Sequence, residues 1–209
     1  MGAEMELTTS GAIDRARALA RRGRRVLLGI TGEPGAGKST LGAELSSALG
    51  ADAAVVPMDG FHLAQSRLEE LGRVDRKGAP DTFDAWGFVS LVRRLADAAE
   101  PVTYAPAYRR ELHNGVTGAI PVERSTPLVI IEGNYLLLEE EPWCLVHGLM
   151  DEIWYVDVDE DLRMRRLAAR HERFGKSHEA AIAWAAGPDE SNAVLIRATC
   201  DRADAIVRV

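Results

Sequence analysis

The sequence predicts an α/β fold, a sandwich of helices around a parallel β-sheet, and two observations indicate it. Short apolar runs alternate with helical patterns along the chain, as in proteins built from strand–helix–strand units. A glycine-rich segment joins the first apolar run to the helical pattern after it, as where a strand passes into a helix at a binding loop. With 209 residues, 46% of them hydrophobic, the chain can bury one sizeable core, so we expect a single domain over residues 1–209.

An amphipathic helix is expected ahead of the first strand. Ile13, Ala16, Leu19 and Ala20 recur at helical spacing after a group of cap-type residues, and the pattern stops at Gly23. The apolar runs that follow are short, and we interpret them as buried parallel strands. They are residues 26–31, 54–58, 128–131, 153–158 and 205–209. Further helical segments are expected near residues 38–49, 84–99, 142–150, 159–173, 176–186 and 190–200.

The connection over residues 61–127 is long for a compact domain and is rich in glycine and proline. Such segments are often lids or binding loops. Within it, residues 76–84 and 104–110 combine cations, tyrosines and turn residues, a mixture suited to a pocket for an acceptor substrate. We favour Tyr108 and Arg109 as substrate-binding residues. The alternative is that the tyrosines have only a structural role at the edge of the core.

The glycine-rich segment at residues 32–39 reads Gly-Glu-Pro-Gly-Ala-Gly-Lys-Ser and fits the phosphate-binding pattern G-x-x-x-x-G-K-[ST]. Its glycines let backbone N–H groups turn toward phosphate oxygens, Lys38 reaches the β- and γ-phosphates, and the Ser39 hydroxyl is a natural Mg²⁺ ligand. A plain glycine-rich turn is the alternative, which the strand before it and the helix after it disfavour. The predicted ATP-binding residues are Gly32, Glu33, Pro34, Gly35, Ala36, Gly37, Lys38, Ser39 and Thr40.

Two acidic residues, Asp59 and Glu132, stand where the second and third apolar runs end. Ligands of an open parallel sheet bind at the carboxyl ends of its strands. Phosphoryl transfer to a hydroxyl needs a base for the hydroxyl proton and an acid that holds Mg²⁺ or its water, and these two carboxylates suit both tasks. The alternative is that these acidic residues follow buried strands only because the chain becomes exposed to solvent there. His62 and Asn134 lie beside them in the sequence and are expected to bind substrate with them.

Four arginines, Arg163, Arg166, Arg170 and Arg173, are spaced so as to share one face of the helix predicted over residues 159–173. Guanidinium groups are suited to clamping phosphate because they donate two parallel hydrogen bonds. A solvated face in an arginine-rich chain is an equal alternative. Arg166 and Arg170 are the predicted catalytic pair.

Composition excludes several classes of partner. The formal net charge of −7 argues against a protein that coats nucleic acid or an anionic membrane, because that binding depends on basic patches. Cys144 and Cys200 lack metal-ligand spacing and suggest no disulfide framework, which fits a reducing cytoplasm. No apolar run approaches the length of a membrane span. The expected partner is a small-molecule substrate, with a homodimer as an alternative to a monomer.

Five segments together resemble the phosphoribulokinase/uridine kinase family of small-molecule kinases in order and spacing. They are residues 32–39, 58–62, 76–80, 104–109 and 131–135. The sequence is similar in particular to bacterial nucleoside/nucleotide kinase-like and fructose-transport-associated kinases, and pantothenate kinase is a nearby relative. The resemblance implies a P-loop NTPase-type three-layer sandwich with a five-stranded parallel sheet, ATP with Mg²⁺, Asp59 as the base, and an arginine-bearing helical lid at about residues 160–175. Ser39 and Glu132 are then the expected metal ligands.

The expected function is transfer of the γ-phosphoryl group of ATP to a hydroxyl of a small metabolite, with a fructose-like sugar favoured and a nucleoside or pantothenate as alternatives. Uridine and pantothenate kinases have their own residues where this chain has Arg109 and Arg110, and two arginines favour an acceptor that carries a phosphate or carboxylate. A nucleotide-dependent switch or binding module is the rival class. The sequence has neither an Asn-Lys-x-Asp base reader nor a Leu-Ser-Gly-Gly-Gln transporter signature, and both absences favour the kinase.

Overall fold

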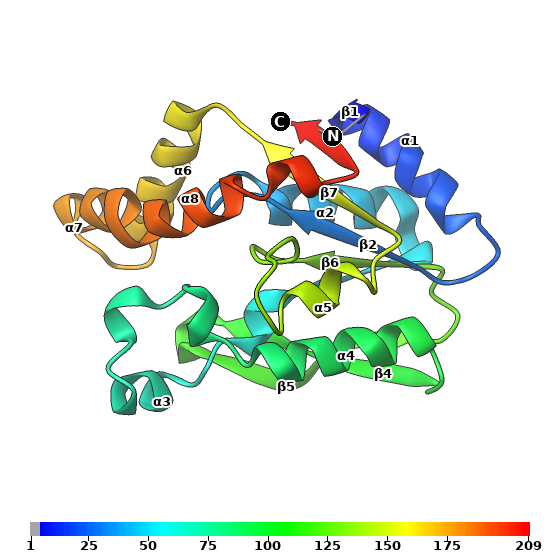
Figure 1. The fold of residues 1–209 in the computed structure, drawn as a ribbon, viewed down its shortest axis with the longest axis horizontal. Helices are drawn as coiled ribbons and strands as arrows, with labels where there is room; N and C mark the ends of the chain where they lie inside the picture. Colours follow the sequence, from blue (N-terminus) through cyan, green and yellow to red (C-terminus); the bar gives the residue numbers. More distant parts are fainter. Residues whose placement is uncertain (1–4) are drawn as a thin grey trace.

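A computed structural model describes residues 5–209 and contains a six-stranded sheet with helices on both faces (Figure 1). The strand order is β1-β8-β7-β2-β6-β3, and every neighbouring pair is parallel. The strands are β1 (Met5–Thr8), β2 (Val26–Thr31), β3 (Ala53–Pro57), β6 (Leu128–Glu132), β7 (Glu152–Asp157) and β8 (Ala205–Arg208). A separate antiparallel hairpin is formed by β4 (Val102–Arg109) and β5 (Asn114–Glu123).

The predicted α/β class with a parallel sheet is confirmed, but the expected count of five strands is wrong by one. The additional strand is β1, which pairs with β8 at the sheet edge, from Met5 opposite Ala205 to Thr8 opposite Arg208. It is only four residues long, and half-buried residues alternate in it with exposed ones. Such a strand contains no continuous apolar run, and its signal is only the short alternation of apolar and polar residues in Met-Glu-Leu-Thr.

Two hydrophobic clusters, one on each face of the sheet, make up the three layers. β2 is buried along its whole length, and its side chains point alternately to the two faces. Leu28 packs in one cluster with Leu19 and Leu45, which lie on helices before and after β2. Leu27 belongs to the other cluster, with Phe88 from the long connection.

Eight α-helices are described, and most lie where the sequence predicts them. They are α1 (Thr9–Ala20), α2 (Lys38–Leu49), α3 (Gln65–Glu70), α4 (Ala85–Asp97), α5 (Cys144–His147), α6 (Glu160–Arg173), α7 (His178–Trp184) and α8 (Glu190–Arg197). The segment expected to be helical near 142–150 is helical only over α5, and a π-helical turn, Ala185–Asp189, links α7 to α8. Within residues 5–209, none of the helices is long and apolar enough to cross a membrane.

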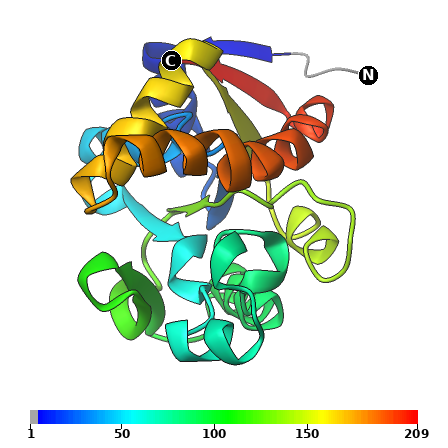
Figure 2. The same ribbon diagram turned by 90° about the vertical axis from the view of Figure 1, so that its left-hand side faces the viewer.

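The long connection over residues 61–127 holds α3, α4 and the β4–β5 hairpin, which lie on the opposite side of the molecule from α6, α7 and α8 (Figures 1 and 2). The exit of β3 packs directly on the hairpin. A Cβ atom at Gly60 would collide with the carbonyl oxygen of Pro106, so only glycine allows this approach. The contact fixes Asp59, one residue earlier, beside the hairpin.

Candidate active site

A cavity of about 930 Å³ lies where the carboxyl ends of β2, β3 and β6 meet, between the α6–α8 side and the hairpin side. This is the position that an open parallel sheet offers to ligands. The predicted site residues that line it are Pro34, Gly35, Gly37, Lys38, Ser39, Thr40, Asp59, His62, Tyr108, Glu132, Asn134, Arg166 and Arg170. Four predicted residues do not line it: Gly32, Glu33, Ala36 and Arg109.

The phosphate-binding loop leaves the first N–H groups of α2 without side-chain partners. Gly37 stands before α2 with a φ of 103°, a conformation that favours glycine, and no side chain caps the helix. Gly35, with a φ of 84°, packs against α6, where a Cβ atom would collide with Leu167. A helix that begins with free N–H groups attracts phosphate through its dipole and its hydrogen bonds.

Lys38 is buried at the base of this loop. Its Nζ donates hydrogen bonds to the carbonyl oxygens of Gly32 and Glu33, at 2.8 and 2.9 Å. Burial lowers the pKa of the Lys38 ammonium to about 8, against the opposing charge of Glu132. The phosphates of a nucleotide would favour the charged form of this side chain.

Two carboxylates at strand ends, Asp59 and Glu132, line the cavity together with the hydroxyl of Ser39 from the first turn of α2. Ser39 Oγ donates a hydrogen bond to Glu132 Oε1 at 3.0 Å. Burial raises the pKa of Glu132, and the neighbouring charge of Asp59 raises it further. A hydroxyl and carboxylates are the hard oxygen ligands that Mg²⁺ prefers, and Mg²⁺ is often held by one or two protein groups plus phosphates. These groups therefore fit a magnesium ion bound together with nucleotide phosphates.

Asp59 keeps its carboxylate open to the cavity, because 47% of its side chain is exposed. It is the backbone carbonyl of Asp59, at 2.9 Å, that contacts His62 Nδ1; the carboxylate lies 4.0 Å away. The His62 ring packs on Phe83 and Tyr108, with centroid distances of 4.1 and 4.9 Å. The aromatic packing holds His62 in place and leaves the Asp59 carboxylate open to the cavity.

The four arginines of α6 do not share one environment, in contrast to the sequence prediction. Arg166 and Arg170 line the cavity, and Arg166 Nη1 lies 3.4 Å from the Ala36 carbonyl oxygen. Arg163 is 1% exposed and points into the protein. Leu167 is buried as well, so the inner side of α6 packs on the phosphate-binding loop while its arginines at 166 and 170 face the cavity.

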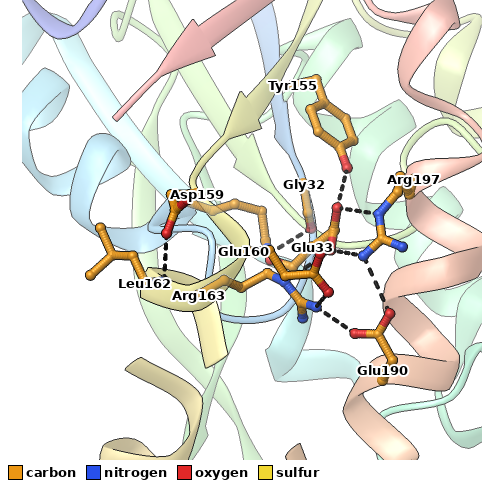
Figure 3. A network of polar contacts seen from close by, with 10 residues as sticks. Gly32, Glu33, Tyr155, Asp159, Glu160, Leu162, Arg163, Glu190 and Arg197 are labelled. Atoms are coloured by element: carbon orange, nitrogen blue, oxygen red, sulfur yellow. Dashed lines mark hydrogen bonds and ion pairs between the residues drawn. The ribbon is translucent and has the colours of Figure 1, made fainter. Parts of the chain in front are cut away.

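A network of charges on the outer side of the loop explains the burial of Arg163 (Figure 3). Arg163 forms ion pairs with Glu33, at 3.0 Å, and with Glu190. Arg197 donates two hydrogen bonds to Glu33, at 2.9 and 2.7 Å, and Tyr155 donates a third at 3.3 Å. The Glu33 side chain is thus directed away from the cavity and ties the loop to α6 and α8.

The sequence placed Lys77 and Arg110 in segments expected to form an acceptor pocket, and both line the cavity. Sequence reasoning missed four other lining residues, which are His113, Phe174, Lys176 and Trp184. Arg110 follows β4 (Val102–Arg109) and begins a 3₁₀-helical turn, Arg110–Leu112, so the two-residue period of the strand does not place its side chain. Arg110 lines the cavity, whereas Arg109, the last residue of β4, does not.

Comparison with known families matches residues 27–209 to the phosphoribulokinase / uridine kinase family. This chain belongs to that family. The match spans the phosphate-binding loop, both strand-end carboxylates, the hairpin and α6. As a family member with this cavity, the chain is an ATP-dependent phosphotransferase that acts on a small molecule, as the sequence predicts.

The chain is also similar to individual proteins over most of its length. A Schizosaccharomyces pombe protein provisionally named a uridine kinase is 39% identical over 170 residues, covering 76% of this chain and 71% of that protein. The Escherichia coli K12 protein YggC is 31% identical over 191 residues, covering 89% and 78%. A crystal structure from Silicibacter sp. TM1040, provisionally described as a fructose transport system kinase, is 36% identical with a TM-score of 0.83, covering 93% and 98%.

Proposed function

We propose that this family member transfers the γ-phosphoryl group of ATP to a hydroxyl group of a fructose-like sugar. The observation that carries the proposal is that one cavity holds a phosphate-binding loop, an open carboxylate at Asp59 and two arginines. The sugar is supported by the name of the Silicibacter relative, which matches nearly the whole chain at 36% identity.

The donor side of the reaction uses the loop and α2. Backbone N–H groups at the start of α2 hold the phosphates, and Lys38 exchanges its two carbonyl partners for phosphate oxygens. Ser39 and Glu132 would hold Mg²⁺, which supplies positive charge to the β- and γ-phosphates when it is bound. Arg166 and Arg170 neutralise the charge that spreads over the transferring group.

The acceptor side depends on Asp59. As the acceptor oxygen bonds to the γ-phosphorus, its proton moves to an Asp59 carboxylate oxygen, and ADP leaves with the electron pair of the broken phosphorus–oxygen bond. His62, Tyr108 and Asn134 line the same cavity and orient the acceptor. Positioning of this kind supplies much of the rate of phosphoryl transfer, because the protein does little covalent chemistry.

A nucleoside kinase is the second candidate. The relative from Schizosaccharomyces pombe is named for uridine, and the rings of Phe83, His62 and Tyr108 pack on one another at tilted angles and line the cavity, where they could contact a base. Pantothenate remains a third acceptor to test. The cytoplasmic location and the homodimer remain predictions.

The variant Asp59→Asn tests the proposal because asparagine keeps the shape of the side chain but accepts no proton. We expect transfer to slow by roughly 10²- to 10⁴-fold, the usual contribution of a general base, while calorimetric ATP affinity stays unchanged. The measurement is ADP release from ATP with a panel of sugars, nucleosides and pantothenate. Asp97→Asn makes the same chemical change at the exposed end of α4 and serves as the control.

Turnover of Asp59→Asn within a few-fold of the wild type would remove Asp59 as the base. A collapse of ATP affinity would instead make Asp59 a metal ligand or structural residue and move the base to Glu132. ATP hydrolysis that ignores every acceptor but responds to a protein partner would favour a nucleotide-dependent switch.

A further inference from the structure

The cavity concentrates positive charge in a chain that is negative overall. The whole sequence has 25 Lys and Arg residues against 32 Asp and Glu residues. The cavity lining reverses this ratio, with six cations, Lys38, Lys77, Arg110, Arg166, Arg170 and Lys176, against four acids, Glu44, Asp59, Glu132 and Asp189. All three lysines of the chain are among the six. Lys38, Arg166 and Arg170 serve the phosphoryl donor in the proposed function, which leaves the other three unassigned.

Lys77 is held in the cavity by neutral groups alone. Its Nζ donates to Gln65 Oε1 and to the His113 carbonyl oxygen, both at 3.1 Å, and lies 5.4 Å from the centre of the Tyr108 ring. An ammonium group has three N–H donors, so one remains for a ligand. The side chain is positioned, and its charge is not neutralised by a carboxylate.

Arg110 has a similar environment. Its guanidinium stacks over the Phe174 ring at 4.7 Å, a contact that joins the hairpin to the end of α6. Within the described residues 5–209, neither Arg110 nor Lys77 forms an ion pair with a carboxylate. Stacking fixes the plane of the guanidinium and leaves its N–H groups free to donate.

Both cations stand on the acceptor side of the cavity. Lys77 and His62 each pack on the Tyr108 ring, and His62 contacts Asp59. Burial lowers the pKa of His62, and the charges of Lys77 and Arg110 lower it further, against the opposing charge of Asp59. The two cations and the carboxylate of the proposed base thus all lie close enough to His62 to affect its charge.

We propose that Lys77 and Arg110 bind an anionic group, a phosphate or a carboxylate, that the acceptor carries in addition to the hydroxyl it presents to Asp59. The inference rests on the proposed kinase function and specifies its substrate class as a phosphorylated or carboxylated polyol. The Asp59 carboxylate repels an anion, while Lys77 and Arg110, whose charges both act on the neighbouring His62, attract it. This polarity orients the acceptor with its hydroxyl toward the γ-phosphate.

Matched acceptor pairs test the proposal through ADP release. The pairs are fructose and fructose 6-phosphate, uridine and uridine 5′-monophosphate, and glycerol and glycerate. We expect the anionic member of at least one pair to be used with a kcat/KM roughly 100-fold or more above its neutral partner, the effect of two charge-assisted contacts. Phosphate and carboxylate acceptors are separated by the third pair.

The variants Lys77→Gln and Arg110→Gln identify the anion subsite. Each is expected to raise KM for the anionic acceptor by roughly 10- to 100-fold and to leave KM for ATP unchanged. Arg93→Gln, an exposed arginine on α4, is the matched control. Arg109→Gln compares the two adjacent arginines, and a loss confined to Arg109→Gln would overturn the assignment to Arg110. Equal use of neutral and anionic acceptors, with both variants unaffected, would overturn the proposal as a whole.

A binding measurement tests the anion subsite independently of the enzyme's activity. With the phosphate-binding loop occupied by a non-hydrolysable ATP analogue, calorimetry measures binding of inorganic phosphate to the wild type and to the Lys77→Gln/Arg110→Gln double variant. We expect binding to the wild type and at least a tenfold loss in the double variant. Equal binding to both proteins contradicts the subsite. Phosphate binding that depends on both residues, without ADP release from any acceptor, would leave the subsite standing and overturn the proposed kinase reaction.

Discussion

Two groups of charged side chains flank the phosphate-binding loop, and they differ in their partners. On the outer side, Arg163 and Arg197 form ion pairs with Glu33 and Glu190, so each cation meets carboxylates of the same chain. In the cavity, Lys77 and Arg110 are held by carbonyl, amide and aromatic groups, which keep them in position without cancelling their charge.

The difference separates structural charges from charges available to a ligand. Charges that are paired within the protein fix one element to another, and removal of one partner leaves the other uncompensated. Charges that are held by neutral groups in a cavity are not neutralised, so their electric field acts on any ligand that enters the cavity.

Substitution of Arg163 should lower stability most. Arg163→Met keeps much of the buried stem but removes the cation between Glu33 and Glu190, which still share Arg197. We expect a loss of about 3 kcal/mol, or roughly 6–12 °C in melting temperature for a chain of this size. Arg163 Nη1 has no hydrogen-bond partner, which keeps the expected loss at the lower end for a buried pair.

Calorimetric melting of Arg163→Met against the wild type measures this effect, with Arg93→Gln as the surface control. The double variant Arg163→Met/Glu190→Gln should regain part of the loss, because it removes one of the uncompensated carboxylates. An unchanged melting temperature in Arg163→Met would show that the outer network does not stabilise the fold.

Substitution of the cavity arginines should affect turnover and leave stability unchanged. Arg166→Ala and Arg170→Ala each remove a guanidinium from the cavity, where Arg166 is exposed and Arg170 half-buried. We expect kcat to fall by roughly 10- to 100-fold, the effect of one charge-assisted contact, with stability within about 0.5 kcal/mol of the wild type. Steady-state ADP release and thermal melting measure the two quantities. Normal turnover with a large drop in melting temperature would assign these arginines to the structural group.

The smallest effect should come from pH acting on the outer network. Burial raises the pKa of Glu190, but the hydrogen bond and charge of Arg163, with the charge of Arg197, outweigh it and hold the pKa below its ordinary value. A carboxylate with a lowered pKa adds stability above its ordinary pKa, and this stability is lost as the pH falls through the lowered value. The wild type should therefore exceed Glu190→Gln by about 1 kcal/mol near pH 7, and the gap should close in acid.

Melting of both proteins between pH 7 and pH 3 measures that gap. Glu179→Gln, an exposed change on α7, should show no such closure. A gap that stays constant in acid would mean that the ionised carboxylate of Glu190 contributes nothing to the outer network.

The sequence by itself determined the features that arise from local patterns. The loop at residues 32–39 could be read because its glycines, lysine and serine stand in fixed order between a strand and a helix. The positions of Asp59 and Glu132 followed because apolar runs define where buried strands end, and parallel strands end at one edge. The lining of a single cavity by Lys38, Asp59, Glu132 and Arg166 agrees with that reasoning.

Only the tertiary structure decided which charges are paired and which remain open. Glu33 and Arg197 are separated by 164 positions, and nothing in the spacing of either residue indicates the other. A helix face defined by spacing alone placed Arg163 with Arg166, whereas packing of α6 on the loop turned Arg163 inward. The choice of Arg110 over Arg109 likewise depended on where the hairpin docks. Pairings of this kind come from the assembly of distant elements, because ion pairs and stacking act through space and leave no period in the chain.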